Sequence, residues 1–421
     1  MKILIVGSGG REHAIAQTLL KSPNVEKVFC SPGNGGTATL AHCQNLAVAV
    51  DDFAGIIQVV KDNGIELVVV GPEVPLAMGI ADYLQQQEIA VFGPVKAGAK
   101  IEASKSWAKD LMLEGNIPTA KFATFTDAVI AKKYIQQQGA PIVIKADSLA
   151  AGKGVIVAMT EAEATTAIDE LFGLGFDTLV IEEFLQGEEA SVLALTDGKT
   201  IIPLLPAQDH KRIGEGDTGK NTGGMGAYAP APLVTPDIMQ RIEREVLQPT
   251  IDTLNHRGID YHGILYAGLM ITPKGDPKVV EFNCRFGDPE TQAVLPLLDT
   301  PLDELMLACV RGELANVNIK WKPGSAVCVV AAAGGYPDTY EKGKEITGLD
   351  TVTDATVFHA GTKKEGDRIL TNGGRVLGIT AVGNTLSEAI SQVYSAIAKI
   401  HFEDLSYRKD IGKKASMRDK G

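Results

Sequence analysis

The fold of this chain is decided by the stretch Val-Val-Glu-Phe-Asn-Cys-Arg-Phe-Gly-Asp-Pro-Glu-Thr-Gln, residues 279–292. It begins as a strand, and the alternation of a strand places Glu281, Asn283 and Arg285 on one face. Carboxylate and amide oxygens are hard ligands that suit Mg²⁺, and a guanidinium group matches a carboxylate or a phosphate. Such side chains are costly to bury without partners, so a solvated edge strand is the more frequent outcome of this pattern. The stretch alone leaves both a metal-binding strand and a plain edge strand open.

The composition is that of an ordinary globular protein with several domains. The chain has 421 residues, of which 45% are hydrophobic and 22% charged, so we expect two to four domains. Its formal net charge is −12 and no long basic run is present, which argues against nonspecific nucleic-acid binding. An anionic ligand would have to be bound by local features of the chain.

Cysteine usage and hydropathy indicate the compartment. Five cysteines are scattered without a CxxC pair, which indicates a reducing cytoplasm and no structural zinc. A strand pattern begins at residue 2, so no signal peptide is expected. No apolar run approaches the ~18 residues of a membrane span. We therefore expect a cytoplasmic protein that binds neither membranes nor nucleic acid.

The first hundred residues are predicted to form a doubly wound parallel sheet. Apolar strands alternate with helical segments, and glycine-bearing loops follow the strands, which we place at 2–6, 27–30, 67–70 and 90–92. Folds of this kind bind ligands in the crevice at the carboxyl ends of their strands. We place this N-terminal α/β domain at residues 1–101.

The remaining residues are predicted to form two further domains. Mixed strands and helices indicate an α+β domain over 102–300, with a flap subdomain at about 122–190, and a small C-terminal α/β domain over 301–421. Expected hairpins pair 191–195 with 200–206 and 266–272 with 278–283, and expected helices span 103–114 and 236–255. In the last domain we expect strands at 326–332, 356–360 and 376–382 and a helix at 385–399.

Three glycine loops at strand ends are candidate anion sites. The first, residues 7–12, resembles a dinucleotide fingerprint, but Glu12 stands where that motif needs a small residue, which argues against a nicotinamide-dependent dehydrogenase. The N-terminus of the following helix, beside Arg11, still suits an anion. The loop 32–37 can present backbone N–H groups to a phosphate, and Glu73 can accept from ribose hydroxyls. Each loop alone can also be a turn chosen for its geometry, whereas three at equivalent strand ends favour a ligand site.

A second set of residues suits a polyphosphate. Lys145 ends an apolar strand, and the small-residue loop after it carries Lys153 between Gly152 and Gly154. A flap over a triphosphate needs small side chains for close approach and cations for charge. The loop is not a Walker A loop, because the spacing of that motif is absent. Lys105 could add a cation, although a lone lysine on a helix is more often solvated.

A strand that runs into Glu182-Glu183-Phe184-Leu185 can act as a hinge for adenine. Backbone groups would read the edge of the base, apolar side chains would enclose the ring, and Glu188 would accept from the ribose. The alternative is an acidic surface turn, which this segment alone would favour.

Residues 209–228 are predicted to form a long polar loop without secondary structure. Loops of this length are uncommon unless they are functional, and the mixture of cations, acids and glycines is typical of an active-site lid. His210 could act there as a general base, although a structural role is more frequent. No Ser/His/Asp or Cys/His arrangement supports a covalent hydrolase.

The order of these segments is that of the ATP-grasp ligases, and the chain most closely resembles the phosphoribosylamine–glycine ligase (glycinamide ribonucleotide synthetase) family. The resemblance extends from residue 1 to about residue 411, and it is carried by residues 1–12, 32–37, 71–75, 223–228, 285–292 and 407–412. One departure lies in the flap, which usually reads Ala-Asp-Gly-Leu-Ala-Ala-Gly-Lys-Gly and here has Ser148 in place of the first glycine. If that position requires a positive φ, the serine is modestly strained.

The resemblance implies that ATP, glycine and 5-phospho-β-D-ribosylamine react through a glycyl phosphate to give glycinamide ribonucleotide, ADP and phosphate, a step of purine biosynthesis. It implies Glu281 and Asn283 as ligands of Mg²⁺ or Mn²⁺. It also implies Arg285, Asp209 and Lys211 as catalytic residues, with Arg285 on the carboxylate of glycine and Asp209 on its ammonium group.

The resemblance further implies two sets of binding residues. Those for ATP are Lys105, Lys145, Gly152, Lys153, Gly154, Glu182, Glu183, Phe184, Leu185 and Glu188. Those for the other substrates are Gly9, Gly10, Arg11, Glu12, Gly33, Asn34, Gly35, Gly71, Glu73, His210, Gly224, Met225 and Asp288. Its partners are expected to be small molecules, and we expect a monomer. Another ATP-grasp carboxylate–amine ligase with a different phosphorylated acceptor, and a noncatalytic nucleotide sensor, remain alternatives.

Overall fold

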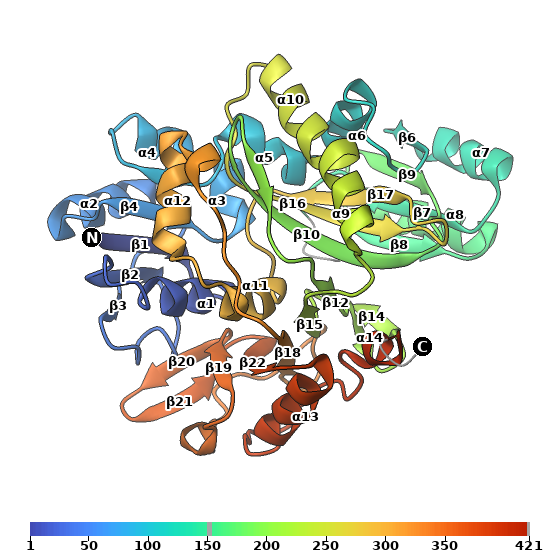
Figure 1. Cartoon of the computed structure of the whole chain (residues 1–421). Helices are drawn as coiled ribbons and strands as arrows, with labels where there is room; N and C mark the ends of the chain where they lie inside the picture. The colour runs from blue at the N-terminus through green and yellow to red at the C-terminus, as the bar shows by residue number, and fades with distance from the viewer. Residues whose placement is uncertain (150–153, 419–421) are drawn as a thin grey trace.

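The structure is a computed structural model, and it describes residues 1–149 and 154–418. Three groups of strands surround the short helix α11 (Glu290–Val294), which lies between the N-terminal sheet, the central sheets and the C-terminal sheet (Figure 1). This helix begins at Glu290, within the stretch 279–292. The chain therefore places that stretch where its three parts meet.

The N-terminal part is a five-stranded parallel sheet with the order β3-β2-β1-β4-β5, which confirms the predicted doubly wound domain. Strand β4 is buried along its whole length, as expected where helices cover both faces of a parallel sheet. The strands are β1 (Lys2–Gly7), β2 (Lys27–Pro32), β3 (Cys43–Asn45), β4 (Leu67–Val70) and β5 (Val91–Phe92). The helices are α1 (Gly10–Leu19), α2 (Phe53–Asn63), α3 (Glu73–Met78) and α4 (Ile80–Gln85).

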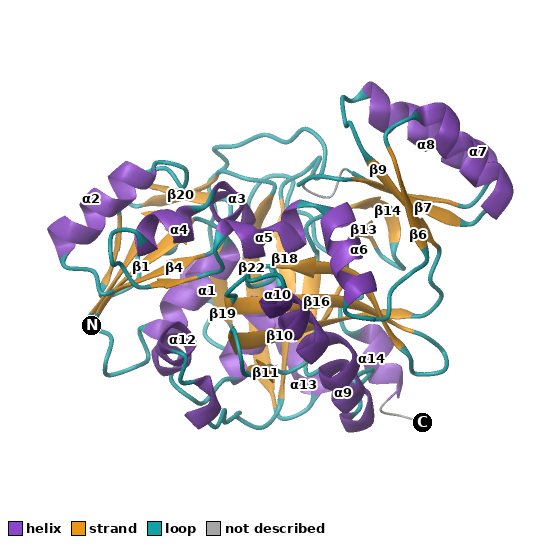
Figure 2. Ribbon diagram, turned by 90° about the horizontal axis from the view of Figure 1, so that it is seen from above, coloured by secondary structure: helices purple, strands orange, loops and turns teal. Residues whose placement is uncertain are grey.

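Two antiparallel four-stranded sheets form the centre, with the orders β11-β10-β16-β17 and β6-β9-β7-β8. The first contains β10 (Glu188–Asp197), β11 (Ile201–Pro203), β16 (His262–Ile271) and β17 (Pro277–Asn283). The second contains β6 (Phe122–Phe125), β7 (Ile142–Ala146), β8 (Val155–Ala158) and β9 (Leu179–Glu183), with α7 (Ala128–Gln138) and α8 (Glu161–Gly173). This second sheet and its helices project from the body of the molecule (Figure 2) and bury a hydrophobic cluster of their own. These elements span the segment predicted as the flap subdomain.

Two predicted helices are present and differ from the prediction only in detail. The helix expected at 103–114 begins after Ser104, which separates α5 (Lys96–Ala103) from α6 (Lys105–Glu114) and caps α6 by accepting a bond from Trp107 N at 3.2 Å. The helix expected at 236–255 runs without a gap from α9 (Pro236–Ile242) through a π-helical turn over Glu243–Leu247 to α10 (Gln248–His256). Hydrophobic periodicity does not reveal the cap or the π-helical turn.

The third sheet, β12-β15-β18-β22-β19, takes strands from both sides of residue 300. It contains β12 (Gln208–Asp209), β15 (Gly226–Ala229), β18 (Ser325–Ala332), β19 (Thr356–His359) and β22 (Arg375–Gly383), and α13 (Leu386–Ile397) packs on it. The prediction of a loop without secondary structure over 209–228 was wrong, because the segment forms the hairpin of β13 (Arg212–Gly214) and β14 (Thr218–Asn221) and begins β15. These strands are short and rich in glycine, and β15 gains its partner β18 only in the folded chain.

The remaining elements complete the contacts between the parts. They are the hairpin β20 (Thr362–Glu365) and β21 (Arg368–Thr371), which was not predicted, and the helices α12 (Leu302–Arg311) and α14 (Lys413–Arg418). One buried cluster joins Ile3 of the N-terminal sheet to Leu193 of the central sheet and Leu305 of α12, so these parts share a core. Within the described residues, no helix has both the length and the apolar character needed to cross a membrane.

Candidate active site

Strand β17 presents the predicted metal ligands next to a β-bulge. Gly268 of β16 pairs with Glu281, whereas Leu269 pairs with Val279, so Val280 is an extra residue in the strand. The carbonyl of Val280 accepts a hydrogen bond from Nζ of Lys145 at 3.0 Å. The bulge therefore connects the strand of Glu281 to the lysine of the other central sheet.

Glu281 lies in a positive setting. Its Oε1 atom is 3.4 Å from Nζ of Lys211, and Lys211 also lies 2.9 Å from Glu189. The charge of Lys211, with smaller contributions from Lys145 and Lys105, lowers the pKa of Glu281 to about 2. The carboxylate is therefore ionised throughout the physiological range and is available to a cation.

Asn283 follows two residues later and is almost fully buried, and its Oδ1 accepts from Nη2 of Arg285 at 3.3 Å. In the part of the chain that the structure describes, no group of three or more His, Cys, Asp or Glu side chains could hold a metal ion. A carboxylate and an amide oxygen nevertheless fit Mg²⁺, which is usually held by one or two protein oxygens together with substrate phosphates and water.

Lys145 belongs to a cluster of buried ion pairs that lies between the two central sheets. Its Nζ lies 3.0 Å from Glu182 Oε1, and Nζ of Lys109 lies 3.1 Å from Glu182 Oε2. The side chain of Glu182 thus faces these lysines, whereas the segment after it, Phe184 and Leu185, is half-buried. Lys109 was missed by the sequence analysis, because a lysine in the middle of α6 carries no signal that distinguishes it from a solvated one.

Lys105, the first residue of α6, reaches the predicted flap. Its Nζ donates to the carbonyl of Ser148 at 2.8 Å. Among the described residues Ser148 is not one of those with positive φ, so the serine is not strained there. Gly152 and Lys153 lie outside the described residues, and Gly154 follows them directly before β8.

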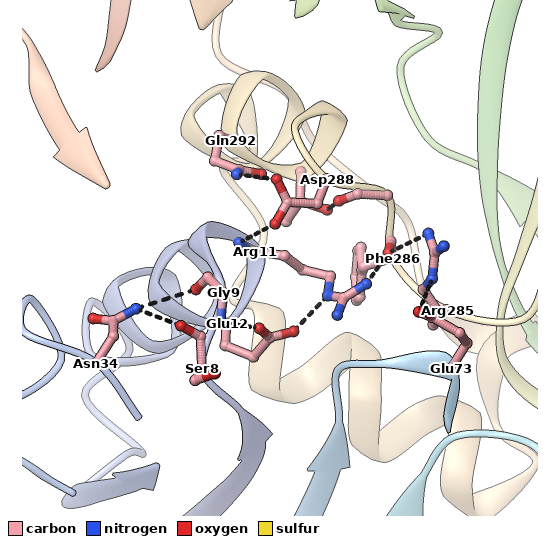
Figure 3. A network of polar contacts seen from close by, with 12 residues as sticks. Ser8, Gly9, Arg11, Glu12, Asn34, Glu73, Arg285, Phe286, Asp288 and Gln292 are labelled. Atoms are coloured by element: carbon pink, nitrogen blue, oxygen red, sulfur yellow. Dashed lines mark hydrogen bonds and ion pairs between the residues drawn. The ribbon is translucent and has the colours of Figure 1, made fainter. Parts of the chain in front are cut away.

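Arg285 forms ion pairs with two carboxylates of the N-terminal half. Its Nη2 donates to Glu102 Oε1 at 2.7 Å. Its Nε donates to Glu73 Oε2 at 3.2 Å (Figure 3). Burial raises the pKa of Glu102, and the charge of Arg285 offsets part of this effect. Glu102 was not predicted, because nothing in the sequence connects the end of α5 with a residue so far along the chain.

The first glycine loop is built around Glu12. Its carboxylate accepts from Gly9 N and from Nε of Arg11, each at 2.5 Å, in a capping box at the start of α1. A Cβ atom on Gly71 would lie 2.0 Å from Glu12 Oε1, so Gly71 has to be glycine while Glu12 keeps this position. Glu12, which does not fit the dinucleotide fingerprint, thus contacts two of the predicted glycine loops and fixes their shape.

Arg11 and Asp288 connect this loop to the stretch after β17. Nη1 of Arg11 donates to the carbonyl of Phe286 at 3.1 Å, and the backbone N of Arg11 donates to Asp288 Oδ2 at 3.2 Å (Figure 3). Gln292 donates to the other oxygen of Asp288 at 2.9 Å. The N-terminal loop and the metal strand therefore meet directly.

The second glycine loop is held by Asn34. Its Nδ2 donates to the carbonyl of Ser8 at 3.0 Å and to that of His359 at 2.7 Å, and its Oδ1 accepts from the backbone N of Gly36 at 2.9 Å. Gly33 has a φ of +72°, and Gly35 N donates to the carbonyl of Thr362 in β20 at 3.2 Å. The side chain of Asn34 thus holds the loop in its shape, and the C-terminal part packs against this loop.

Arg375, at the start of β22, is a further residue that the sequence analysis missed. It lies 3.3 Å from Asp288 Oδ1 and donates to the carbonyl of Gly223 at 2.7 Å, next to Gly224 and Met225. It therefore brings a cation from the C-terminal part to the predicted substrate loops. Two glycines directly before Arg375 could have indicated a loop that approaches a ligand, and they were the one signal in the sequence.

Strand β12 ends at Asp209, and His210 and Lys211 follow it in the chain. Burial raises the pKa of Asp209 to about 8, and Lys211 opposes this shift. His210 is 4% exposed, its Nδ1 is 3.4 Å from the carbonyl of Gly226, and burial lowers its pKa to about 4. The imidazole is therefore neutral and faces the third sheet. Asp209 and Lys211 instead lie near Glu281, whose negative charge acts on both.

The two facing antiparallel sheets, the lysines between them and the carboxylate–amide strand define an ATP-grasp protein, and residues 103–291 match the model described as phosphoribosylglycinamide synthetase, ATP-grasp (A) domain. Residues 1–102 match the N domain and residues 326–414 the C domain of the same synthetase. The chain belongs to the phosphoribosylamine–glycine ligase family.

Relatives support this assignment along the whole chain. Phosphoribosylamine–glycine ligases of Nostoc sp. and Synechocystis sp. are 62% and 58% identical, over 98% and 99% of this chain and 99% and 100% of their own. The crystal structure of phosphoribosylamine–glycine ligase from Thermotoga maritima matches with a TM-score of 0.85 at 35% identity, over 98% of this chain and 100% of that one. Biotin carboxylase from Campylobacter jejuni shares only the fold, with 15% identity and a TM-score of 0.71 over 97% of this chain and 93% of its own.

Proposed function

We propose that this chain joins glycine to 5-phospho-β-D-ribosylamine at the expense of ATP, through a glycyl phosphate, and releases glycinamide ribonucleotide, ADP and phosphate. The observation that carries the proposal is the juxtaposition of an ionised Glu281 and Lys145 with the glycine loops at the carboxyl ends of the N-terminal strands. The first pair suits a metal-bound triphosphate, and the loops suit a sugar phosphate. Full-length relatives that carry the name of this ligase support the same function.

ATP would bind between the two central sheets. Lys105 and Lys145 would neutralise its phosphates together with the flap residues Gly152 to Gly154. Because the Glu182 side chain is engaged by Lys145 and Lys109, we expect the backbone of residues 182–185 to read the adenine and Glu188 to accept from the ribose. Phosphoryl transfer depends mainly on such positioning and charge neutralisation.

Glu281 and Asn283 would hold Mg²⁺ or Mn²⁺. An ion held there would supply positive charge to offset the charge that develops on the phosphates of ATP. Lys211 keeps Glu281 ionised before the ion arrives, because the lowered pKa removes any competition from a proton.

Glycine would bind beside Arg285, whose guanidinium group suits a carboxylate. The contact of Arg285 with Glu73 is longer than its contact with Glu102, 3.2 Å against 2.7 Å, so the carboxylate of glycine would displace Glu73 first. Glu73 would then be free to accept from a hydroxyl of the ribose. Asp209 would accept from the ammonium group of glycine, and Lys211 would stabilise the carboxylate oxygen that attacks the phosphate.

The phosphate of the acceptor would bind near the N-terminus of α1, beside Gly9, Gly10 and the cationic side chain of Arg11. The backbone N–H groups of Gly9 and Arg11 donate to Glu12 and Asp288, so they would have to exchange these carboxylates for the phosphate. The loop with Gly33, Asn34 and Gly35 would line the same pocket. Gly71, Gly224, Met225 and Asp288 lie around it, with His210 behind Met225, whose backbone N donates to the carbonyl of His210 at 2.8 Å. Arg375 adds a second cation from the C-terminal part.

The test is phosphate release from ATP with each substrate omitted in turn. The proposal requires release that depends on both glycine and phosphoribosylamine, with stoichiometric ADP. A nucleotide sensor would bind ATP without release under any condition. Release that needs another phosphorylated amine in place of phosphoribosylamine would establish the alternative ATP-grasp ligase and reject this assignment.

A further inference from the structure

Arg408 lies between α13 and α14 and is the largest side chain that the fold buries completely, with 1% of its surface exposed. It forms ion pairs with Asp217 at 2.9 Å and with Asp410 at 2.7 Å. A buried guanidinium group with two carboxylate partners is an expensive arrangement that persists only with good geometry. None of the steps proposed above uses this residue.

Both Arg408 and its partner Asp410 contact the β13–β14 hairpin. Nη1 of Arg408 donates to the carbonyl of Arg212 at 3.0 Å, and Asp410 accepts from the backbone N of Gly216 at 2.9 Å. Lys414 forms a second ion pair with Asp217. The segment 408–414 therefore holds the hairpin at its base and at its turn.

Among the residues that the structure describes, the hairpin itself has few other contacts, although Gly223, just past its end, contacts Tyr336 and Arg375. Its residues are half-buried or exposed, with β14 mostly exposed, and β13 and β14 pair only with each other. Its other ion pair, between Lys220 and Asp338, has both side chains about two-thirds exposed and is expected to contribute little. Its position thus depends on the buried contacts of Arg408.

The hairpin directly follows Lys211, one of the residues proposed to contact glycine. Arg212, whose carbonyl accepts from Arg408, directly follows Lys211, and the carbonyl of Lys211 accepts from Thr222 N at 2.8 Å at the other end of the hairpin. A shift of the hairpin would therefore move Lys211 and, with it, Asp209.

We infer that Arg408 is a positioning residue for the ligase reaction, which fixes Asp209 and Lys211 against glycine by anchoring the β13–β14 hairpin from the C-terminal segment. The inference rests on the proposed function, since glycine is the substrate whose site the hairpin borders. It predicts an effect on glycine that is much larger than any effect on ATP.

The experiment compares Arg408→Gln and Asp217→Asn with wild type by steady-state kinetics and by hydrogen exchange of residues 212–221. We expect the KM for glycine to rise about tenfold or more in both variants and kcat to fall, because small misplacements of positioning groups have large effects on rate. The KM for ATP should stay within about twofold, and amide exchange in the hairpin should become faster. Arg408→Lys should show a smaller rise in the KM for glycine than Arg408→Gln, but it should not reach the wild-type value. Lysine keeps the charge but cannot bridge Asp217, Asp410 and a carbonyl at once.

Two matched controls remove exposed ion pairs. Lys220→Gln breaks the surface pair of the same hairpin, and Lys344→Gln breaks the exposed pairs with Glu341 and Glu403 in the same C-terminal part. Both should leave the KM for glycine and the exchange of the hairpin unchanged.

If Arg408→Gln does not fold, Asp217→Asn decides the question, because Asp217 is 35% exposed and its loss leaves Arg408 paired with Asp410. Wild-type KM for glycine and unchanged hairpin exchange in a folded variant would overturn the inference, as would equal rises in the KM for glycine and for ATP. An inactive wild-type enzyme would instead reject the proposed function, and the exchange data would still report whether Arg408 holds the hairpin.

Discussion

Lys211 lies 3.4 Å from Glu281, although 70 residues separate them in the sequence. The lysine comes from the segment after β12 and the glutamate from β17, so their contact joins the third sheet to the central one. It also places an ionised carboxylate beside three lysines, a setting that suits a metal-bound polyphosphate and explains why Glu281 remains charged.

Replacement of Glu281 by glutamine should lower ligase turnover by on the order of 100-fold or more, because the amide oxygen that remains carries no negative charge to hold the metal ion. The fold should persist, since the Glu281 side chain is half-exposed and the substitution leaves the backbone pairing of β17 with β16 unchanged. Circular dichroism measures whether the fold persists, and a steady-state assay at saturating Mg²⁺ measures turnover. Asp276→Asn, at the turn of the same β16–β17 hairpin, is the matched control and should keep full activity; near-normal turnover of Glu281→Gln would refute the metal assignment.

Replacement of Arg285 by alanine should lower the free energy of unfolding by about 3 kcal/mol, because it leaves the buried Glu102 without its partner. Urea denaturation measures this change. The double variant Arg285→Ala with Glu102→Gln should recover much of the stability and none of the activity. Recovery of both would mean that Arg285 acts only through the fold, whereas loss of activity without loss of stability would mean that the pair with Glu102 is weak.

The kcat/KM for glycine should rise with pH and level off above about pH 8. Burial raises the pKa of Asp209 to about 8, so below that pH the carboxyl group is mostly protonated and must lose its proton before it can pair with the ammonium group of glycine. The slope should approach tenfold per pH unit below the plateau. A pH profile of Asp209→Asn should be lower and flat; a variant with the wild-type profile would assign the titration to another group.

Replacement of Gly71 by alanine should destabilise the protein by about 1–3 kcal/mol and raise the KM for phosphoribosylamine, because the new Cβ would lie 2.0 Å from Glu12 Oε1 and must displace it. Thermal unfolding and steady-state kinetics measure the two effects. Gly173→Ala, where nothing lies within 4 Å of the new atom, is the control and should change neither quantity appreciably. If Gly71→Ala behaves like this control, Glu12 does not shape the loop.

The parts of the fold that depend on local pattern could be predicted from sequence. The parallel strands, the two central hairpins and the order of the ATP-grasp segments follow from apolar runs and the glycines that end them. The β13–β14 hairpin and β15 could not be predicted, because β15 is stabilised by its pairing with β18 and not by a pattern of its own. The helix expected to begin at residue 103 begins after Ser104, because the Ser104 side chain caps α6.

The site divides in the same way. Glu281, Asn283 and Arg285 could be named because one strand carries all three, and the resemblance to a known family supplied the roles. Glu102, Lys109 and Arg375 could not, since each is defined by a partner from a distant segment. The bulge at Val280 was likewise invisible, because it arises from the register with β16.

The most direct test of the proposed reaction follows an oxygen atom. Glycine labelled with ¹⁸O in its carboxyl group is incubated with the enzyme, ATP and phosphoribosylamine, and the released phosphate is examined by mass spectrometry. Attack of the carboxylate on the γ-phosphate predicts one ¹⁸O atom in each phosphate that leaves. Glycinamide ribonucleotide formed together with unlabelled phosphate would contradict a glycyl phosphate, and labelled glycine that yields no product would contradict the ligase itself.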